Sequence, residues 1–485
     1  MTLRIAVRRC HNNIHGNEGM PKDAAFWQFL YLIFCKMYDE QRSGEQREFW
    51  AGPYEPFAPK GQKVIRQRID PLFTAVKAKY RELFKGNEEI TLSDRALAFI
   101  VSELSRYDFG RTDVDAKGAA YQEIVGTNLR GDRGQYFTPR GAIRLAVQIL
   151  SPQENQRVLD PACGTGGFLV ETLNHLNKQF LAEEQKQADE ENTVEFNSRR
   201  DRLASFATKN LFGADFDPFL VRAAQMNVMM AGTALGQLFH MNSLEFPLGH
   251  LPGQKPAKEV IDLGTADIVM TNPPFGSDIP VTERTILEQY ELARRWKPHG
   301  DGFIMEPTLK PAVAPEVLFI ERCVQWLKPG GRMGIVLPDG ILGNPGDEYI
   351  RYWILRHCWV LASIDLPVEC FIVEANVNIL TSLLFLKKKP QQEIQAADLG
   401  QKQDYPVFMA VAEKVGFDRR GNTLYKRHPD GEEILVDKTY QEKVRIGGKL
   451  EVRTLHRKDR ILDDDLPAIA AAYREFRVQH PEPGR

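Results

Sequence analysis

The period of the apolar residues changes near Arg157, and this change constrains the fold more than any other feature of the sequence. Beyond it, short β-rich segments alternate with stretches of helical period. The segments are RVLD (157–160), LFGAD (211–215), ADIVMT (266–271), RMGIVLP (332–338), LASIDLP (361–367) and VNILTSLLFL (377–386). Strands that alternate with helices predict a mostly parallel sheet covered by helices on both faces. We therefore predict an α/β fold with a doubly wound sheet.

The chain before this change has a helical pattern. After about Lys389 the alternation of strands and helices weakens. Phe26, Phe29, Leu30 and Ile33 recur at three- and four-residue steps, as expected for the core face of helices. The tail carries turn signals at residues 420–422 and 430–431, which predict a small β-hairpin region there, and a final helix is expected over 466–477. We predict an N-terminal helical domain (1–130), a catalytic domain (131–390) and a C-terminal extension (391–485).

Composition excludes several classes of protein. The 485 residues are 43% hydrophobic and 26% charged, as in globular proteins, and the net charge of −2 argues against nucleic-acid binding through bulk charge. No apolar run reaches the ~20 residues of a membrane span, and no secretory signal is visible, so we expect a cytoplasmic protein. Six scattered cysteines without a C-x-x-C pair predict reduced thiols and no metal site.

A glycine-rich turn follows the first predicted strand. The strand ends at Asp160, and the turn contains Gly164, Thr165, Gly166 and Gly167, followed by Phe168 at the start of a helix. Such a turn is where an α/β sheet binds a nucleotide-like ligand, although a tight strand-to-helix connection would have the same glycines. Asp160 can accept from a cationic amino group, and the turn lacks the spacing of a phosphate-binding loop.

The second predicted strand ends in an acid that suits a ribose. A carboxylate at this place can accept both hydroxyls of an adenosine ribose, and Asp215 is our candidate. Asp217 is expected at the start of the following helix.

An amide side chain and an aromatic ring follow the strand at 266–271, in the sequence Asn272, Pro273, Pro274 and Phe275. By itself the tetrapeptide would be a rigid turn. Next to a cofactor site it suits methylation of an exocyclic amine, whose lone pair is conjugated into its ring. Asn272 and the Pro273 carbonyl would accept the N–H groups, and Phe275 would stack on a base swung out of the duplex.

These motifs resemble the S-adenosylmethionine site of the DNA adenine-N6 methyltransferases. The resemblance implies a Rossmann-like methyltransferase sheet, and it adds a cofactor motif at Gln135, Tyr136, Phe137, Thr138, Pro139 and Arg140. Those residues would close over the methionine end of the cofactor, while Thr138 and Pro139 also fit a helix start. Where the family usually has an acid that contacts adenine, this chain has Asn242.

The context of the motifs resembles the modification subunit of type I restriction-modification systems. The resemblance includes the segment 115–123 (DAKGAAYQE) and extends from about Trp27 to Lys389, with a fainter continuation to about Leu435. It implies duplex DNA as substrate, a specificity subunit as partner and a restriction subunit in the same system, in host-DNA marking or phage defence. A stand-alone adenine methyltransferase, an enzyme acting on protein glutamine or RNA, and a silent DNA-binding module are the alternatives.

The extension has two features without an assigned role. Its basic residues between Lys443 and Arg460 suit phosphate contacts or form a solvated face. The final helix would pack on a specificity subunit or on its own domain.

Overall fold

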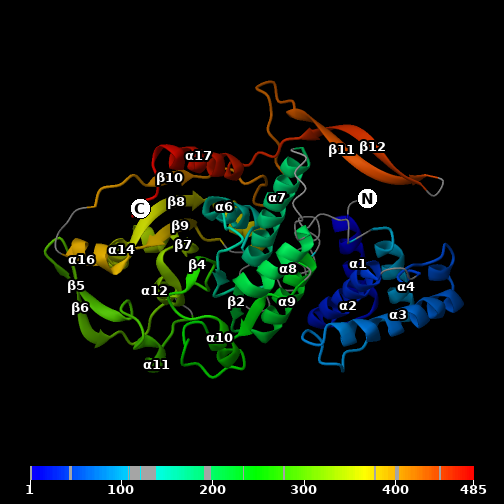
Figure 1. The fold of residues 1–485 in the computed structure, drawn as a ribbon, viewed down its shortest axis with the longest axis horizontal. Helices are drawn as coiled ribbons and strands as arrows, with labels where there is room; N and C mark the ends of the chain where they lie inside the picture. The colour runs from blue at the N-terminus through cyan, green and yellow to red at the C-terminus, as the bar shows by residue number, and fades with distance from the viewer. Residues whose placement is uncertain are drawn as a thin grey trace.

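The fold is known from a computed structural model, which describes residues 3–42, 46–107, 109, 121, 138–189, 198–232, 234–276, 279–375, 378–398, 403–446 and 449–484. It is an α/β protein with helices at its N-terminus, as predicted (Figure 1). An eight-stranded sheet has the order β10-β8-β9-β7-β4-β1-β2-β3. Only β9 runs antiparallel to its neighbours in this sheet.

Six of the eight strands of the sheet overlap the segments that the sequence predicts, whereas the strands over 237–240 and 408–411 were not predicted. In the order of the sheet they are β10 (Phe408–Val411), β8 (Cys358–Leu366), β9 (Thr381–Lys388), β7 (Leu327–Pro338), β4 (Ala266–Thr271), β1 (Val158–Asp160), β2 (Leu211–Asp215) and β3 (Gln237–His240). Successive residues of a strand point to opposite faces, and both faces are buried here: Leu383 lies in one apolar cluster and Leu384 in the other.

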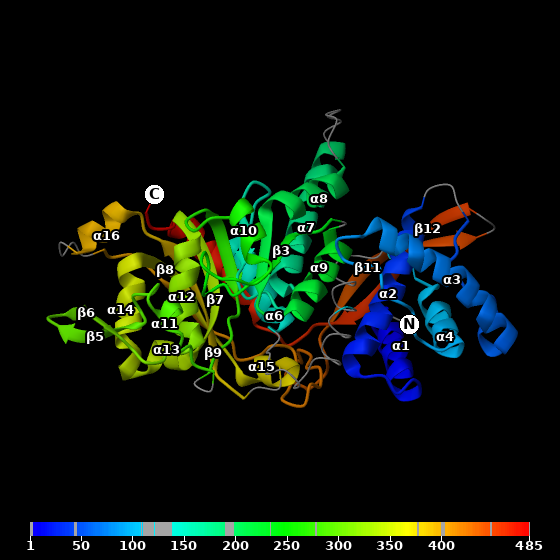
Figure 2. The same cartoon turned by 90° about the horizontal axis from the view of Figure 1, so that it is seen from below.

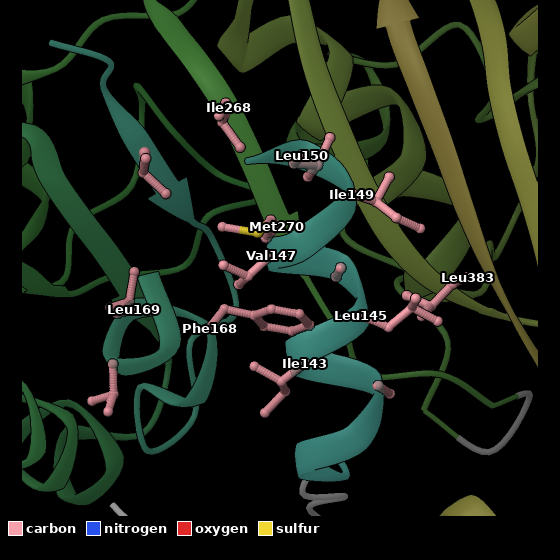
Figure 3. Packing of buried hydrophobic residues seen from close by; sticks show 14 of the residues in the cluster. Ile143, Leu145, Val147, Ile149, Leu150, Phe168, Leu169, Ile268, Met270 and Leu383 are labelled. Atoms are coloured by element: carbon pink, nitrogen blue, oxygen red, sulfur yellow. The ribbon is translucent and has the colours of Figure 1, made fainter. Parts of the chain in front are cut away.

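One face of the sheet is covered by α6 (Arg140–Leu150), α7 (Gly167–Asp189), α8 (Arg199–Asn210), α9 (Pro218–Gly232), α15 (Val368–Ala375) and α17 (Leu466–Gln479). Figure 3 shows how α6 packs there: Ile143, Val147 and Ile149 lie among Phe168, Met270 and Leu383. The other face is covered by α10 (Gln254–Val260), α11 (Arg284–Leu287), α12 (Pro315–Trp326), α13 (Asp339–Gly343) and α14 (Glu348–His357). Helices on both faces are the doubly wound arrangement.

The N-terminal helices form a core of their own. They are α1 (Leu3–Asn17), α2 (Lys22–Gln41), the 3-10 turn η1 (Glu55–Phe57), α3 (Pro59–Lys79) and α4 (Asp94–Leu104). This core also contains Leu220, Ala223 and Met226 of α9. The two views in Figures 1 and 2 show α9 between the N-terminal helices and the sheet.

The chain after residue 390 returns to the sheet and then leaves it. After α16 (Gln391–Asp398), β10 pairs with β8, and α17 packs on α6 through Leu466, Ile469, Ala470 and Tyr473. The final helix therefore packs on its own domain. Between them β11 (Leu435–Ile446) and β12 (Lys449–Arg460) pair as a long two-stranded ribbon (Figure 1). The sequence analysis missed this ribbon, although Gly447 and Gly448 between alternating residues are a hairpin signal.

The segment between β4 and α12 forms a small lobe, which contains the hairpin of β5 (Arg294–His299) and β6 (Gly302–Leu309). Further along the chain, the 3-10 turn η2 (Pro345–Asp347) precedes α14. Arg322 of α12 holds this lobe: its guanidinium donates to the Tyr290 hydroxyl at 2.7 Å and to the Leu244 carbonyl at 3.0 Å. The side chain is 1% exposed, so these bonds replace its hydration. No helix in the described part of the chain combines the length and the apolar character that crossing a membrane needs.

We predict that Arg322→Met lowers the free energy of unfolding by about 2–4 kcal/mol, because buried acceptors lose their donor. Arg284→Met is the matched control, since the side chain of Arg284 is 82% exposed and pairs with Glu288, the residue after α11; it should cost less than ~0.5 kcal/mol. Denaturant unfolding of both variants measures the difference. Equal losses would contradict a specific role of the buried guanidinium.

Candidate active site

Three neighbouring parallel strands end together at one edge of the sheet. Leu159 of β1 pairs with Phe212 of β2 on one side and with Val269 of β4 on the other. Because the strands are parallel, the residues that follow them meet at the carboxyl edge. The sites predicted after each strand, at Asp160, Asp215 and Asn272, are therefore neighbours.

The glycine turn has the conformation that its glycines predict. Gly164 and Gly166 have φ angles of +52° and +82°, which side chains other than glycine rarely adopt. The Cys163 N–H donates to the Ala214 carbonyl at 2.8 Å, and the Gly166 N–H donates to the Cys163 carbonyl at 2.8 Å. The turn is thus fixed to β2 before the helix α7 begins at Gly167.

Asp215 connects the turn to the second strand. Its two carboxylate oxygens accept the N–H groups of Gly164 and Asp217, each at 2.9 Å. The Phe216 N–H also contributes a hydrogen bond to this carboxylate. A carboxylate has about four acceptor positions, so acceptor capacity remains for a ribose hydroxyl. Burial raises the pKa of Asp215 to about 6. Asp217 accepts the Phe219 N–H at 2.8 Å and so caps α9, as predicted.

Asp160 lies deeper than Asp215. Its side chain is 1% exposed, and its carboxylate accepts the Ala162 N–H at 3.2 Å. Burial raises the pKa of Asp160 to about 7, with a further contribution from the charge of Asp215. A cationic group nearby would favour the ionised form of both carboxylates.

The segment after β4 presents an unpartnered acceptor. The side-chain oxygen Oδ1 of Asn272 is buried and has no hydrogen-bond partner among the residues that the structure describes. Pro273 is buried and Pro274 is exposed. The ring of Phe275 is only 5% exposed, so stacking on a base requires it to be uncovered. The next residue, Gly276, donates its N–H to Glu316 at 3.3 Å.

The remaining predicted cofactor residues fall into three groups. Gln135, Tyr136 and Phe137 lie outside the described residues. Thr138 and Pro139 precede α6, which begins at Arg140; the N-cap is Pro139 and not Thr138, because the helix starts one residue later than expected. The side chain of Phe168 packs in the core beside α6 (Figure 3), so a ligand would meet its backbone.

Asn242 is positioned differently from the expectation. Its oxygen accepts the Leu244 N–H at 3.1 Å, and its amide donates to Glu245 at 3.0 Å. The side chain therefore closes a local turn after β3, and an adenine would have to share its oxygen.

The structure adds residues that the sequence analysis did not single out. Phe216, beside Asp215, is 67% exposed and offers a ring to a planar group. The buried Ser243 hydroxyl donates to the Pro161 carbonyl at 2.6 Å, and the buried Asn227 amide donates to the Thr165 carbonyl at 2.9 Å. A single asparagine within the apolar run 226–231 (MNVMMA) is the signal that could have found Asn227.

Two known proteins are similar to this chain in sequence. The chain is 25% identical over 387 residues to a type I restriction enzyme StySPI methylase subunit of Salmonella potsdam, covering 76% of this chain and 64% of that protein. It is 22% identical over 427 residues to the EcoEI methylase subunit of Escherichia coli, covering 81% and 77%. The chain thus spans about two thirds of the length of the first of these relatives.

Two solved structures have a similar fold. A modification subunit of a type I restriction enzyme from Vibrio vulnificus has a TM-score of 0.51 at 21% identity, covering 80% of this chain and 81% of that one. A type I methyltransferase subunit from Streptococcus thermophilus has a TM-score of 0.52 at 17% identity, covering 83% and 94%. The family model described as N-6 DNA Methylase matches residues 112–432, which is more than half of the sequence. The chain therefore belongs to the N-6 DNA methylase family.

Proposed function

We propose that this protein transfers a methyl group from S-adenosylmethionine to N6 of adenine in duplex DNA, as the modification subunit of a type I-like restriction-modification or phage-defence system. The observation that carries the proposal is the buried, unpartnered Oδ1 of Asn272 at the end of β4. A buried acceptor without a donor costs about 1–3 kcal/mol, which favours a bound ligand that supplies an N–H group. The exocyclic amine of adenine is such a donor.

The residues around the glycine turn fit the cofactor. A Cβ atom at Gly164 would meet nothing within 4 Å, so the backbone there has open space for a ligand, and Asp215 keeps acceptor capacity for a ribose. Asp160 supplies a second buried carboxylate for the cationic methionine end. When bound, S-adenosylmethionine supplies an electrophilic methyl group on its sulfonium.

Asn272 and Pro273 would act on the amine. Two acceptors, Oδ1 of Asn272 and the Pro273 carbonyl, would draw the N–H bonds out of the ring plane, so that the nitrogen lone pair leaves conjugation and points toward the cofactor side. Phe275 would stack on the base once its ring is uncovered. The two prolines fix the backbone that holds these groups.

The ribbon of β11 and β12 supports a DNA substrate. Between Leu435 and Arg460 there are eight Lys or Arg residues and four Asp or Glu residues, although the whole chain has a net charge of −2. Lys438 and Arg457 lie directly opposite each other, and both are within 4 Å of the same acid, Asp459. Like charges at facing positions cost stability and suit an anionic partner.

Specificity would come from another subunit. The relatives with similar sequences are methylase subunits of type I restriction enzymes, so each of them is one component of a larger enzyme. Reading several base pairs needs a large recognition surface. We propose that a specificity subunit supplies this surface as a partner, and that a restriction subunit belongs to the same system.

Asn272→Ala should lower the rate of methyl transfer at saturating cofactor by about 100-fold or more, because the amine loses an acceptor that acts in the transition state. Its affinity for S-adenosylmethionine should stay within about twofold. Asp215→Ala should instead weaken cofactor binding by tenfold or more, since a charge-assisted contact is lost. Labelled methyl transfer and calorimetry separate the two effects.

The transfer assay uses duplex DNA, with and without the specificity subunit, followed by hydrolysis to nucleosides. Label in N6-methyladenosine supports the proposed function. Cofactor binding without any label in DNA, combined with label in glutamine or RNA, would contradict it.

Cofactor affinity should increase with pH between about 5.5 and 7.5. Free Asp160 and Asp215 have pKa values of about 7 and 6, and a cationic ligand prefers them ionised, so binding near pH 6.5 should release protons. Below this range affinity should fall by up to about tenfold per pH unit for each carboxylate that must ionise. Calorimetry in buffers of different ionisation enthalpy measures the protons, and Asp160→Asn should reduce the release. A flat pH profile without proton release would refute this.

The ribbon is tested by a triple variant that combines Lys438→Ala, Arg457→Ala and Lys458→Ala. It should bind DNA of any sequence more weakly. The slope of the logarithm of the association constant against the logarithm of the salt concentration should become shallower by about 2–3, because each phosphate contact contributes about 0.9. Lys438→Arg with Arg457→Lys keeps the charge and is the control. Fluorescence anisotropy at several salt concentrations measures both variants. An unchanged slope in the triple variant would show that the ribbon does not contact the DNA phosphates.

A further inference from the structure

Helix α9 is buried on two sides. Leu220, Ala223 and Met226 pack in the N-terminal core, while Val221, Ala224 and Val228 pack in the core of the sheet. These positions recur at three- and four-residue steps, so each set forms one stripe of the helix. A helix that is shared by two cores transmits a displacement of either core to the other.

The side of α9 that faces the sheet touches the glycine turn. Asn227 is 3% exposed, and its amide donates to the Thr165 carbonyl at 2.9 Å. A Cβ atom at Gly166 would lie 3.3 Å from the Cβ of Ala224, so the turn rests closely on the helix. The turn is thus held by β2 through Cys163 and by α9 through Thr165.

The other side of α9 is fixed to the N-terminal helices by specific contacts. Arg222 donates to Glu88 at 2.6 Å and to the Leu83 carbonyl at 3.1 Å, and its guanidinium lies 4.6 Å from the centre of the Trp27 ring. The buried Tyr121 hydroxyl donates to the Ala223 carbonyl at 2.7 Å. The ring of Phe219, at the start of the helix, packs on Trp27 with 4.9 Å between centroids.

We propose that Asn227 is a positioning residue for the cofactor turn, and that through α9 the N-terminal helical domain sets the affinity of the turn for the cofactor. The proposal rests on the proposed function for the identity of that cofactor. The mechanism is preorganisation: a turn held in its bound conformation loses less entropy on binding. Because coupling is reciprocal, cofactor binding stabilises the junction between α9 and the N-terminal helices.

Asn227→Ala tests the first part, with Asn174→Ala as the matched control. Asn174 is also buried, at 1% exposed, but it donates to Glu171 within its own helix. We expect Asn227→Ala to raise the Kd for S-adenosylmethionine about fivefold to twentyfold while kcat at saturating cofactor stays within about threefold. Asn174→Ala should leave the Kd within twofold, whatever its effect on melting temperature.

Arg222→Met tests the second part, with Arg68→Met as its control. Arg68 binds Glu55 at 3.0 and 2.7 Å and lies 4.0 Å from the Trp50 ring centre, so it makes the same kinds of contact within the N-terminal domain. Arg222→Met should weaken cofactor binding at least threefold, and Arg68→Met should not. Equal Kd values for the two variants, at similar losses of melting temperature, would overturn the coupling.

Hydrogen exchange of the cofactor-free protein tests the positioning without a ligand. The amides of Gly164 and Gly166 should exchange about fivefold to twentyfold faster in Asn227→Ala than in wild type or Asn174→Ala. Equal exchange rates would overturn the role of Asn227. If wild-type protein does not bind S-adenosylmethionine, the proposed function is overturned. The exchange rates would still test whether Asn227 holds the glycine turn, because they are measured without ligand.

Discussion

The site depends on the hydrogen-bonded register of three parallel strands. The three-residue strand β1 lies between β2 and β4, and each of its neighbours is held to it by backbone pairing. A shift of one residue in either pairing would move every side chain of that strand to the other face of the sheet. The register therefore determines both which residues fill the two cores and which polar groups meet at the carboxyl edge.

Burial gives this edge its chemical character. The carboxyl groups of Asp160 and Asp215 lose hydration, and their pKa values rise toward neutrality. Oδ1 of Asn272 loses its water without gaining a protein donor in the described structure. Burial of these groups costs free energy in the free protein. A cationic ligand and an N–H donor would offset this cost. A site of this kind destabilises its own fold to gain affinity for its ligand.

The domains are less separate than their order in the chain indicates. Helix α9 belongs to the sheet by its connections but contributes to the N-terminal core, and α17, near the end of the chain, covers α6. The last strand of the sheet, β10, also comes from beyond residue 390. The apolar core on one face of the sheet thus contains elements from several parts of the sequence.

Sequence by itself determined the fold class, six of the eight strands of the sheet and the acids and amide at their ends, because hydrophobic period, turn glycines and strand ends are local properties. Tertiary structure alone decided that Asp160 is buried, that Phe168 lies in the core, that Asn242 closes a turn and that Asn227 holds the glycine turn. It also decided that the final helix packs on α6. Burial and pairing between residues far apart in the chain depend on how elements pack, which no local pattern specifies.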